Sequence, residues 1–92
     1  MSFRILYTPG YNRRVARFLK KHPDLLPHYE KTLRLLEIDP FHPSLRLHRL
    51  KGPLTELHSV SINISYRVTL ELVLQDRQII PVDIGSHDEV YR

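Results

Sequence analysis

The 92 residues have a hydrophobic fraction of 41% and only three glycines, which favours one folded domain spanning residues 1–92 over a disordered chain. Cysteine is absent, and this excludes disulfides, thiolate metal sites and cysteine nucleophiles. The net charge of +4, from 14 basic and 10 acidic residues, favours a polyanionic partner such as RNA, DNA or an acidic protein.

The N-terminal part of the chain predicts a strand followed by a helix. Residues 3–8, "FRILYT", are apolar and partly aromatic, and Pro9-Gly10 is expected to close this strand with a turn. The helix that follows ends before Pro23. Its apolar face is defined by spacings of i, i+4, i+7 and i+8, at Tyr11, Val15, Phe18 and Leu19.

A second helix is predicted between Asp24 and Pro40. Asp24 is expected to be its N-cap, and Pro27 then falls in the first turn, where a missing N–H costs little. Pro40 ends the helix because the residue before a proline disfavours helical backbone. The apolar stripe consists of Leu26, Tyr29, Leu33 and Leu36. The short link between the helices predicts an antiparallel helical hairpin.

The remaining chain changes to a period of two, which is typical of strands. Alternating side chains predict strands at residues 45–50, 57–63, 66–74 and 78–85. The last strand contains Pro81, which cannot donate to a ladder. Either its nitrogen points off the ladder or the strand has a bulge.

The order of these elements predicts an α+β fold, with two helices on one face of a twisted, mainly antiparallel sheet. The first strand is expected to join the sheet near the last. The helices should cover the face with Val68, Leu70 and Leu72. Arg67, Thr69 and Glu71 then lie on a face that no predicted element covers, so we expect the Arg67 side chain to be largely exposed to solvent.

Several kinds of site are disfavoured by the sequence. The six histidines have no compact ligand spacing, so we expect no metal site, and three scattered glycines form no phosphate loop or cofactor motif. No serine has the signature of a nucleophile elbow. His22 and His28 are interpreted as exposed helix residues and His42 as a loop residue. No apolar run could span a bilayer and no signal peptide is evident, so we expect a cytoplasmic protein.

The polar residues of the open sheet face suit RNA chemistry. Cleaving RNA without a metal requires a base, an acid and a cation near the phosphate, which histidine and arginine can supply, while an aromatic ring can stack on an unpaired base. The alternative is that an exposed antiparallel sheet face is simply polar. The candidates are Arg67, His48, Arg49, Lys51, His87, Asp88 and Tyr91.

Four segments together resemble the RelE/ParE superfamily of toxins from bacterial toxin–antitoxin modules. They are the helical hairpin, "DPFHPSLRLHRLKGPL", "HSVSINISYRVTLEL" and the C-terminal "VDIGSHDEVYR". The last is the most specific, because such toxins often end a strand in Gly-Ser/Thr-His and close on an aromatic residue. The resemblance covers nearly the whole chain and implies a ribosome-dependent mRNA endonuclease that a cognate antitoxin neutralises.

The resemblance also implies roles for individual residues. Arg67 matches the strand arginine that contacts the scissile phosphate, His87 the C-terminal histidine, and Tyr91 the terminal aromatic residue. His48 matches a further histidine of one subgroup. Ser61 and Ser65 stand where one subgroup has a histidine and an aspartate. In addition, Arg49, Lys51 and His58 are expected to bind RNA.

Two alternatives for partners remain open at this stage. Another branch of the superfamily poisons DNA gyrase and does not cut RNA. For the antitoxin, the basic stripe Arg13, Arg17 and Lys20 on the first helix offers a surface for an acidic segment. That stripe can equally be a solvated helix face.

Overall fold

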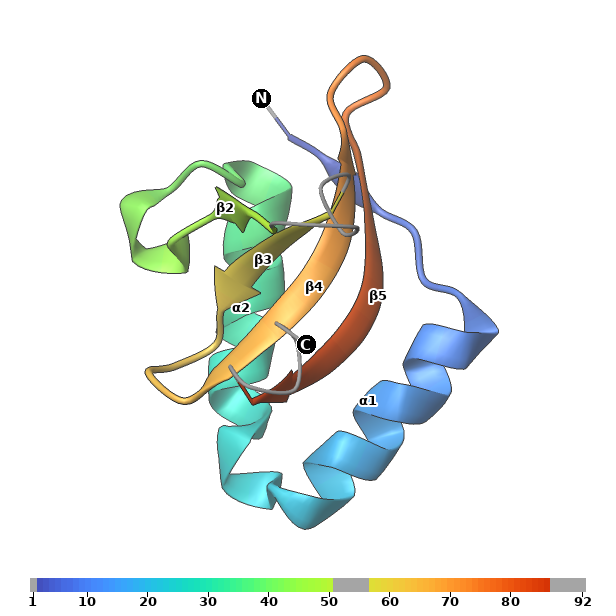
Figure 1. Ribbon diagram of the computed structural model, residues 1–92, viewed down its shortest axis with the longest axis vertical. Helices are drawn as coiled ribbons and strands as arrows, with labels where there is room; N and C mark the ends of the chain where they lie inside the picture. The colour runs from blue at the N-terminus through green and yellow to red at the C-terminus, as the bar shows by residue number, and fades with distance from the viewer. Residues whose placement is uncertain (1, 51–56, 87–92) are drawn as a thin grey trace.

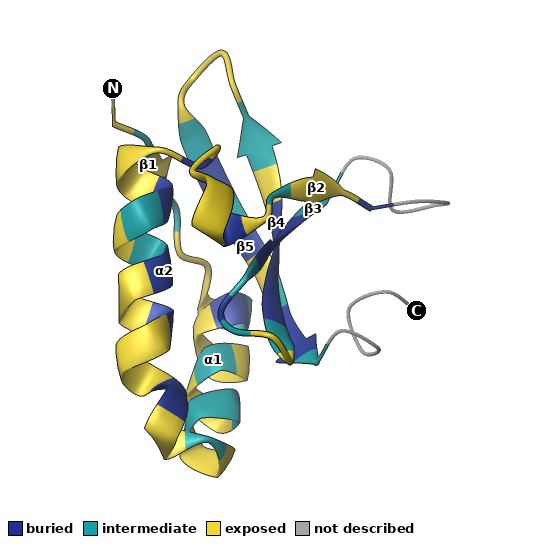
Figure 2. Ribbon diagram, turned by 90° about the vertical axis from the view of Figure 1, so that its left-hand side faces the viewer, coloured by how far each residue is buried: buried dark blue, intermediate teal, exposed yellow. Residues whose placement is uncertain are grey.

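The computed structural model describes residues 2–50 and 57–86, which form two helices on one side of a five-stranded sheet (Figures 1 and 2). The helices are α1 (Pro9–Lys21) and α2 (Leu26–Ile38), with short 3-10 helices at Pro23–Leu25 and Pro43–Leu45. The strands are β1 (Arg4–Ile5), β2 (His48–Arg49), β3 (His58–Ser61), β4 (Tyr66–Val73) and β5 (Gln78–Ser86). None of the helices in these segments is long and apolar enough to cross a membrane.

The sheet has the strand order β1-β5-β4-β3-β2. β1 runs parallel to β5, whereas the other neighbouring pairs are antiparallel. The predicted α+β fold is therefore confirmed, including the pairing of the first strand with the last. The centre of the sheet is the long β4–β5 pair, which Figure 1 shows as a curved ribbon extending well beyond the shorter strands.

The start of α1 differs from the sequence prediction. Pro9 and Gly10 do not close a strand, because they form the first turn of the helix, where proline is well tolerated. Thr8 is the N-cap, and its Oγ1 accepts a hydrogen bond from the backbone N–H of Tyr11 at 3.2 Å. β1 is consequently only two residues long.

The link between the helices also differs from the prediction. Asp24 does not cap α2, because it lies inside the 3-10 helix Pro23–Leu25. This extra turn buries Leu25 and leaves Leu26, which was predicted to belong to the apolar stripe, 44% exposed. Figure 1 shows α1 and α2 diverging from this link, so that α1 lies along β5 while α2 lies behind β3 and β4.

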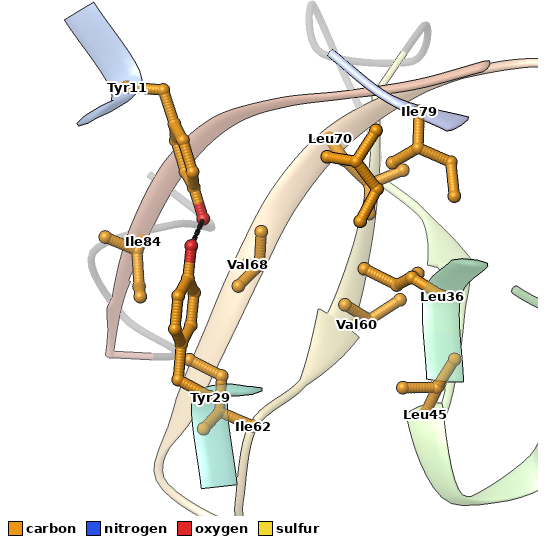
Figure 3. Close-up of a cluster of buried hydrophobic side chains, with 11 residues drawn as sticks. Tyr11, Tyr29, Leu36, Leu45, Val60, Ile62, Val68, Leu70, Ile79 and Ile84 are labelled. Carbon is orange, nitrogen blue, oxygen red and sulfur yellow. Dashed lines mark hydrogen bonds between the residues drawn. The ribbon is translucent and has the colours of Figure 1, made fainter. Parts of the chain in front are cut away.

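The core lies between the helices and the sheet face carrying Val68 and Leu70, both fully buried (Figure 3). Tyr11 of α1 and Tyr29 of α2 meet inside this core, where their hydroxyl groups form a hydrogen bond of 2.8 Å. The apolar pattern of β4 therefore identified the covered face correctly.

Pro81 is accommodated by a bulge in β5. Thr69 pairs with Asp83, but the next residue, Leu70, pairs with Pro81, so Val82 has no partner position on β4. An extra residue of this kind lets a strand contain a proline without losing the rest of its ladder. Of the two predicted solutions, the structure has the bulge.

Candidate functional site

Arg67 is buried, which contradicts the expectation that its side chain is exposed to solvent. Only 8% of its surface is accessible, and Thr69 on the same face is buried as well. The physical reason is the composition of β3. Ser61 pairs directly with Arg67 and Ser59 with Thr69, and these short side chains leave room for the long arginine to lie across the neighbouring strand.

Five contacts fix the position of the Arg67 guanidinium. Its Nε–H donates to Ser59 Oγ and its Nη1 to Ser61 Oγ, both at 2.8 Å. Its Nη2 donates to the carbonyl oxygens of Arg46 at 2.9 Å and Ser59 at 3.3 Å, and lies 3.3 Å from His48 Nδ1. These oxygen and nitrogen atoms hold the cation in one place without removing its charge.

The Arg46 carbonyl reaches this position because of a left-handed backbone. Arg46 directly follows the 3-10 helix Pro43–Leu45 and has φ of 51°, a conformation that is uncommon for a residue with a Cβ. Such strain persists where the surrounding contacts require it. Here the same carbonyl oxygen lies 2.9 Å from Arg67 Nη2 and 3.2 Å from His48 Nδ1, so the strained turn brings two strands' polar groups together.

His48 is exposed and contributes the titratable side chain of this group. If its Nδ1 carries a proton, it donates to the Arg46 carbonyl and the Nε2 lone pair can accept a proton. If Nδ1 is unprotonated, it accepts from Arg67 Nη2 and Nε2–H becomes a donor. The two neighbours therefore accommodate both tautomers, which is the property that a general acid or base requires.

No family model and no curated sequence matches the chain. Solved structures do match. The YafQ crystal structure from E. coli strain BL21(DE3) gives a TM-score of 0.78 at 15% identity, over 98% of this chain and 99% of that one.

Two further structures agree. The E. coli DinJ–YafQ toxin–antitoxin complex gives 0.76 at 15% identity, with both chains covered completely. The YoeB/ParE toxin from Agrobacterium tumefaciens gives 0.74 at 13% identity, over 92% of this chain and 99% of that one.

The chain has the RelE/ParE fold.

Within this RelE/ParE fold, the structure separates the other predicted site residues into two groups. Arg49 pairs with His58, and His58 with Leu70, so this register places both on the same face of the sheet as the core. They are therefore on the opposite face to Arg67. Lys51, His87 and Tyr91 lie outside the described residues.

His58 is partly enclosed at this position. Within residues 2–50 and 57–86 its buried Nδ1 finds no hydrogen-bond partner. Burial, followed by the nearby positive charges of Arg49 and His48, lowers the pKa of the His58 ring below its usual value. A neutral imidazole carries no charge with which to bind phosphate, so the structure does not favour the RNA-binding role expected for His58.

A second basic surface lies between α1 and β5, away from Arg67. A cleft of about 370 Å³ is lined by Arg14, Arg17, Phe18, Lys21, His22, Asp83 and Ile84. Arg14 forms an exposed ion pair with Asp83 at 3.4 Å. His22 is not simply exposed, as was expected, because its ring stacks near Phe18 and Tyr66, with centroids 4.6 and 4.8 Å away.

Sequence reasoning missed the residues that hold Arg67. Ser59 was given no role and Ser61 was noted only as replacing a histidine, and the Arg46 carbonyl cannot be identified from side-chain chemistry. One signal was present: small hydroxyl side chains alternate along β3 on the face that pairs with Arg67. No group of three or more potential metal ligands occurs in the described parts of the chain.

Proposed function

We propose that the protein is the toxin of a toxin–antitoxin module and that it cleaves mRNA on the ribosome without a metal ion. The observation that carries this proposal is the pairing of a fixed arginine with an exposed histidine. Arg67 Nη2 and His48 Nδ1 are 3.3 Å apart, on a fold shared with YafQ and YoeB/ParE toxins. Metal-free RNA cleavage requires a cation, a base and an acid, and this pair offers the cation and one of the two proton-transfer groups.

The chemistry is an internal transfer at phosphorus. The 2′-oxygen forms a bond to the phosphorus and loses its proton to a base, while the bond from phosphorus to the 5′-oxygen breaks and that oxygen receives a proton from an acid. The products are a 2′,3′-cyclic phosphate and a 5′-hydroxyl. The Arg67 charge stabilises the negative charge that develops on the phosphorane oxygens, and it is effective because its position is fixed before the reaction.

The proton-transfer roles are assigned to His48 and, from the resemblance of the C-terminal segment, to His87. In the same way, Tyr91 is proposed to stack on a base, and Lys51 to contact phosphate. His87→Gln keeps hydrogen-bonding capacity but cannot transfer a proton, so we expect mRNA cleavage to fall by about 10²–10⁴-fold. For His48→Gln we expect the loss of mRNA cleavage to lie within the same range.

The decisive experiment is a translation reaction containing purified protein. We expect mRNA fragments that end in a 2′,3′-cyclic phosphate. The competing function is poisoning of DNA gyrase, which predicts intact mRNA and cleaved DNA in a supercoiling reaction. Intact mRNA together with full growth arrest on expression would overturn the nuclease proposal in favour of gyrase.

The proposed partner is an antitoxin with an acidic segment. Arg13, Arg17 and Lys20 are exposed along α1, and the α1–β5 cleft adds further positive groups beside them. Reversing these three charges should weaken antitoxin binding, because rim charges act mainly on the association rate. Reversing Lys31 and Arg34, which are exposed on α2, is the control. Equal antitoxin affinity for both variants would show that the segment docks elsewhere.

A further inference from the structure

A small cleft lies directly beside the Arg67 group, at the end of the β3–β4 hairpin. It has a volume of about 220 Å³ and is lined by Ser44, Arg46, Ser61, Ile62, Asn63 and Ile64. Two of these residues also hold Arg67: Ser61 through its hydroxyl group and Arg46 through its carbonyl oxygen. The cleft is therefore continuous with the proposed reaction site, one hydrogen bond away from the guanidinium.

One wall of the cleft consists of two isoleucines, and packing in the core explains only one of them. Ile62 is buried and belongs to the core cluster, so its presence is explained by packing. Ile64 is 94% exposed at the turn of the hairpin, where it stabilises no core. An aliphatic side chain projecting from a turn beside a polar site provides a contact surface for a flat apolar group.

The other wall carries donors and a positive charge. Asn63 Oδ1 accepts from the backbone N–H groups of Ser65 and Tyr66, both at 2.9 Å, which locks the turn and leaves the amide nitrogen as a donor. Ser44 Oγ lies 2.8 Å from His42 Nδ1, which fixes this hydroxyl at the edge of the cleft. Arg46 is exposed and contributes a cation within the same cleft.

We propose that this cleft binds one unpaired nucleotide of the RNA substrate, next to the nucleotide whose phosphate is cleaved. The apolar face of a base can pack on Ile64, and its hydrogen-bonding edge can accept from the Asn63 amide. The phosphate of the same nucleotide can pair with the Arg46 side chain. Ligand pockets for larger molecules usually occupy about 300–1,000 Å³, and this smaller volume suits a single base. The proposal rests on the proposed RNA cleavage, and it adds a determinant of which nucleotide sequence is cut.

β4 provides a matched control for the apolar contact. Ile64 precedes one end of this strand, near Arg67, and Leu74 follows the other end, in the β4–β5 turn. Both are exposed aliphatic residues, Leu74 by 58%. Ile64→Asp and Leu74→Asp therefore introduce the same charge at turns of the same two-hairpin unit, and neither removes a buried side chain.

The experiment uses the full chain and a short single-stranded oligoribonucleotide with a 2′-deoxy sugar at the cleavage site, so that binding is measured without reaction. We expect Ile64→Asp to weaken binding by about tenfold or more, because it removes the apolar contact and brings a carboxylate near phosphate, whereas Leu74→Asp leaves it unchanged. Arg46→Asn tolerates the left-handed backbone and removes the charge, so the slope of log affinity against log salt should fall by about 0.7.

The outcomes separate this proposal from the one on which it rests. Wild-type protein that cleaves no mRNA in translation reactions overturns the proposed function. Wild-type cleavage, together with equal oligonucleotide affinities for Ile64→Asp and Leu74→Asp at unchanged melting temperatures, overturns only the nucleotide cleft. A changed cut-site preference in Ile64→Ala, with the total cleavage rate retained, would support it further.

Discussion

Residues 2–50 and 57–86 contain two hydrogen-bonded buried polar clusters, one on each face of the sheet, and they differ in chemistry. Between the helices and the sheet, Tyr11 and Tyr29 share a single hydrogen bond of 2.8 Å between neutral hydroxyl groups. On the other face, Arg67 carries a full charge held by Ser59, Ser61 and the Arg46 carbonyl. The first cluster joins two helices, whereas the second joins β4 to β3 and to the turn before β2.

The difference supports the role that we propose for Arg67. Burial raises the pKa of both tyrosine hydroxyls, that of Tyr29 to about 12, so the pair stays neutral under physiological conditions and can only hold the helices together. A buried arginine is costly to place, since its charge must be desolvated. The chain bears that cost beside an exposed histidine, which favours a chemical role for the arginine.

Among the residues of these two clusters, removing Arg67 should produce the largest effect. Arg67→Ala is expected to reduce mRNA cleavage by about 10²–10³-fold, the usual effect of losing one fixed electrostatic group. Since Arg67 is buried, the variant should also lose about 1–3 kcal/mol of unfolding free energy, because the hydrogen bonds that Arg67 donates to the Ser59 and Ser61 hydroxyls are lost. Cleavage should therefore be assayed well below the melting temperature of the variant.

Arg67→Lys separates the two consequences. Lysine keeps the charge but lacks the planar fork that reaches both serine hydroxyls, so activity should stay low while stability recovers in part. Wild-type cleavage rates in Arg67→Lys would show that charge alone matters and that the hydrogen-bonded geometry does not.

Replacing Ser59 tests whether the acceptors position the cation. The hydrogen bond from Arg67 Nε to Ser59 Oγ involves a charged donor, and such bonds contribute about 1.5–3 kcal/mol. If this energy maintains the reactive geometry, Ser59→Ala should lower kcat by about tenfold or more with little change in KM. Ser59→Thr should restore part of the rate, and Ser65→Ala, in the exposed turn, should behave like wild type.

The two clusters were not equally predictable from sequence. Tyr11 and Tyr29 fall on apolar helix faces, so periodicity placed both in the core and gave the α+β fold with its covered sheet face. Periodicity also placed Arg67 on the opposite face, but it gave no information on how a long side chain would turn. That depends on the small side chains of Ser59 and Ser61, which become its neighbours only through strand register.

The helix boundaries show the same limit. Pro9 was predicted to end the first strand, but it is the first residue of α1. Asp24 was predicted to cap α2, but it lies inside the 3-10 helix that precedes α2. The two helices and the long strands β4 and β5 were identified correctly, because repeated spacing averages over many side chains. The strand predicted at residues 45–50 was wrong at its start, because Leu45 ends a 3-10 helix and only His48–Arg49 forms a strand, and the strand predicted at 57–63 is limited to His58–Ser61. A cap or turn depends on one or two residues, and the same residues are compatible with several backbone conformations.

The tyrosine pair should affect stability alone. Tyr11→Phe or Tyr29→Phe leaves one buried hydroxyl without its partner, at a cost of about 1–3 kcal/mol, whereas the double variant removes both hydroxyls and should be less destabilised than the sum of the two. For a domain of this size, each kcal/mol corresponds to about 4–8 °C in Tm. Thermal melting measures this effect, and mRNA cleavage per folded molecule should be unchanged. Reduced cleavage in folded Tyr11→Phe would break the division between the two clusters.

The smallest effect concerns His58, which lies on the core side of the sheet beneath the arginine face. Because its pKa is lowered in the folded protein, the unfolded chain binds more protons as the pH falls below the ordinary histidine value of about 6.5. The contribution of His58 to stability is therefore present above that pH and is lost as the pH falls through the folded pKa.

Unfolding by denaturant at pH 7.5 and at pH 5 should show a smaller loss of stability in His58→Gln than in the wild type. His28→Gln, at an exposed position on α2, should keep the wild-type loss. Identical pH dependence in all three proteins would mean that the His58 ring is hydrated in the folded protein and does not contribute to the pH dependence of stability.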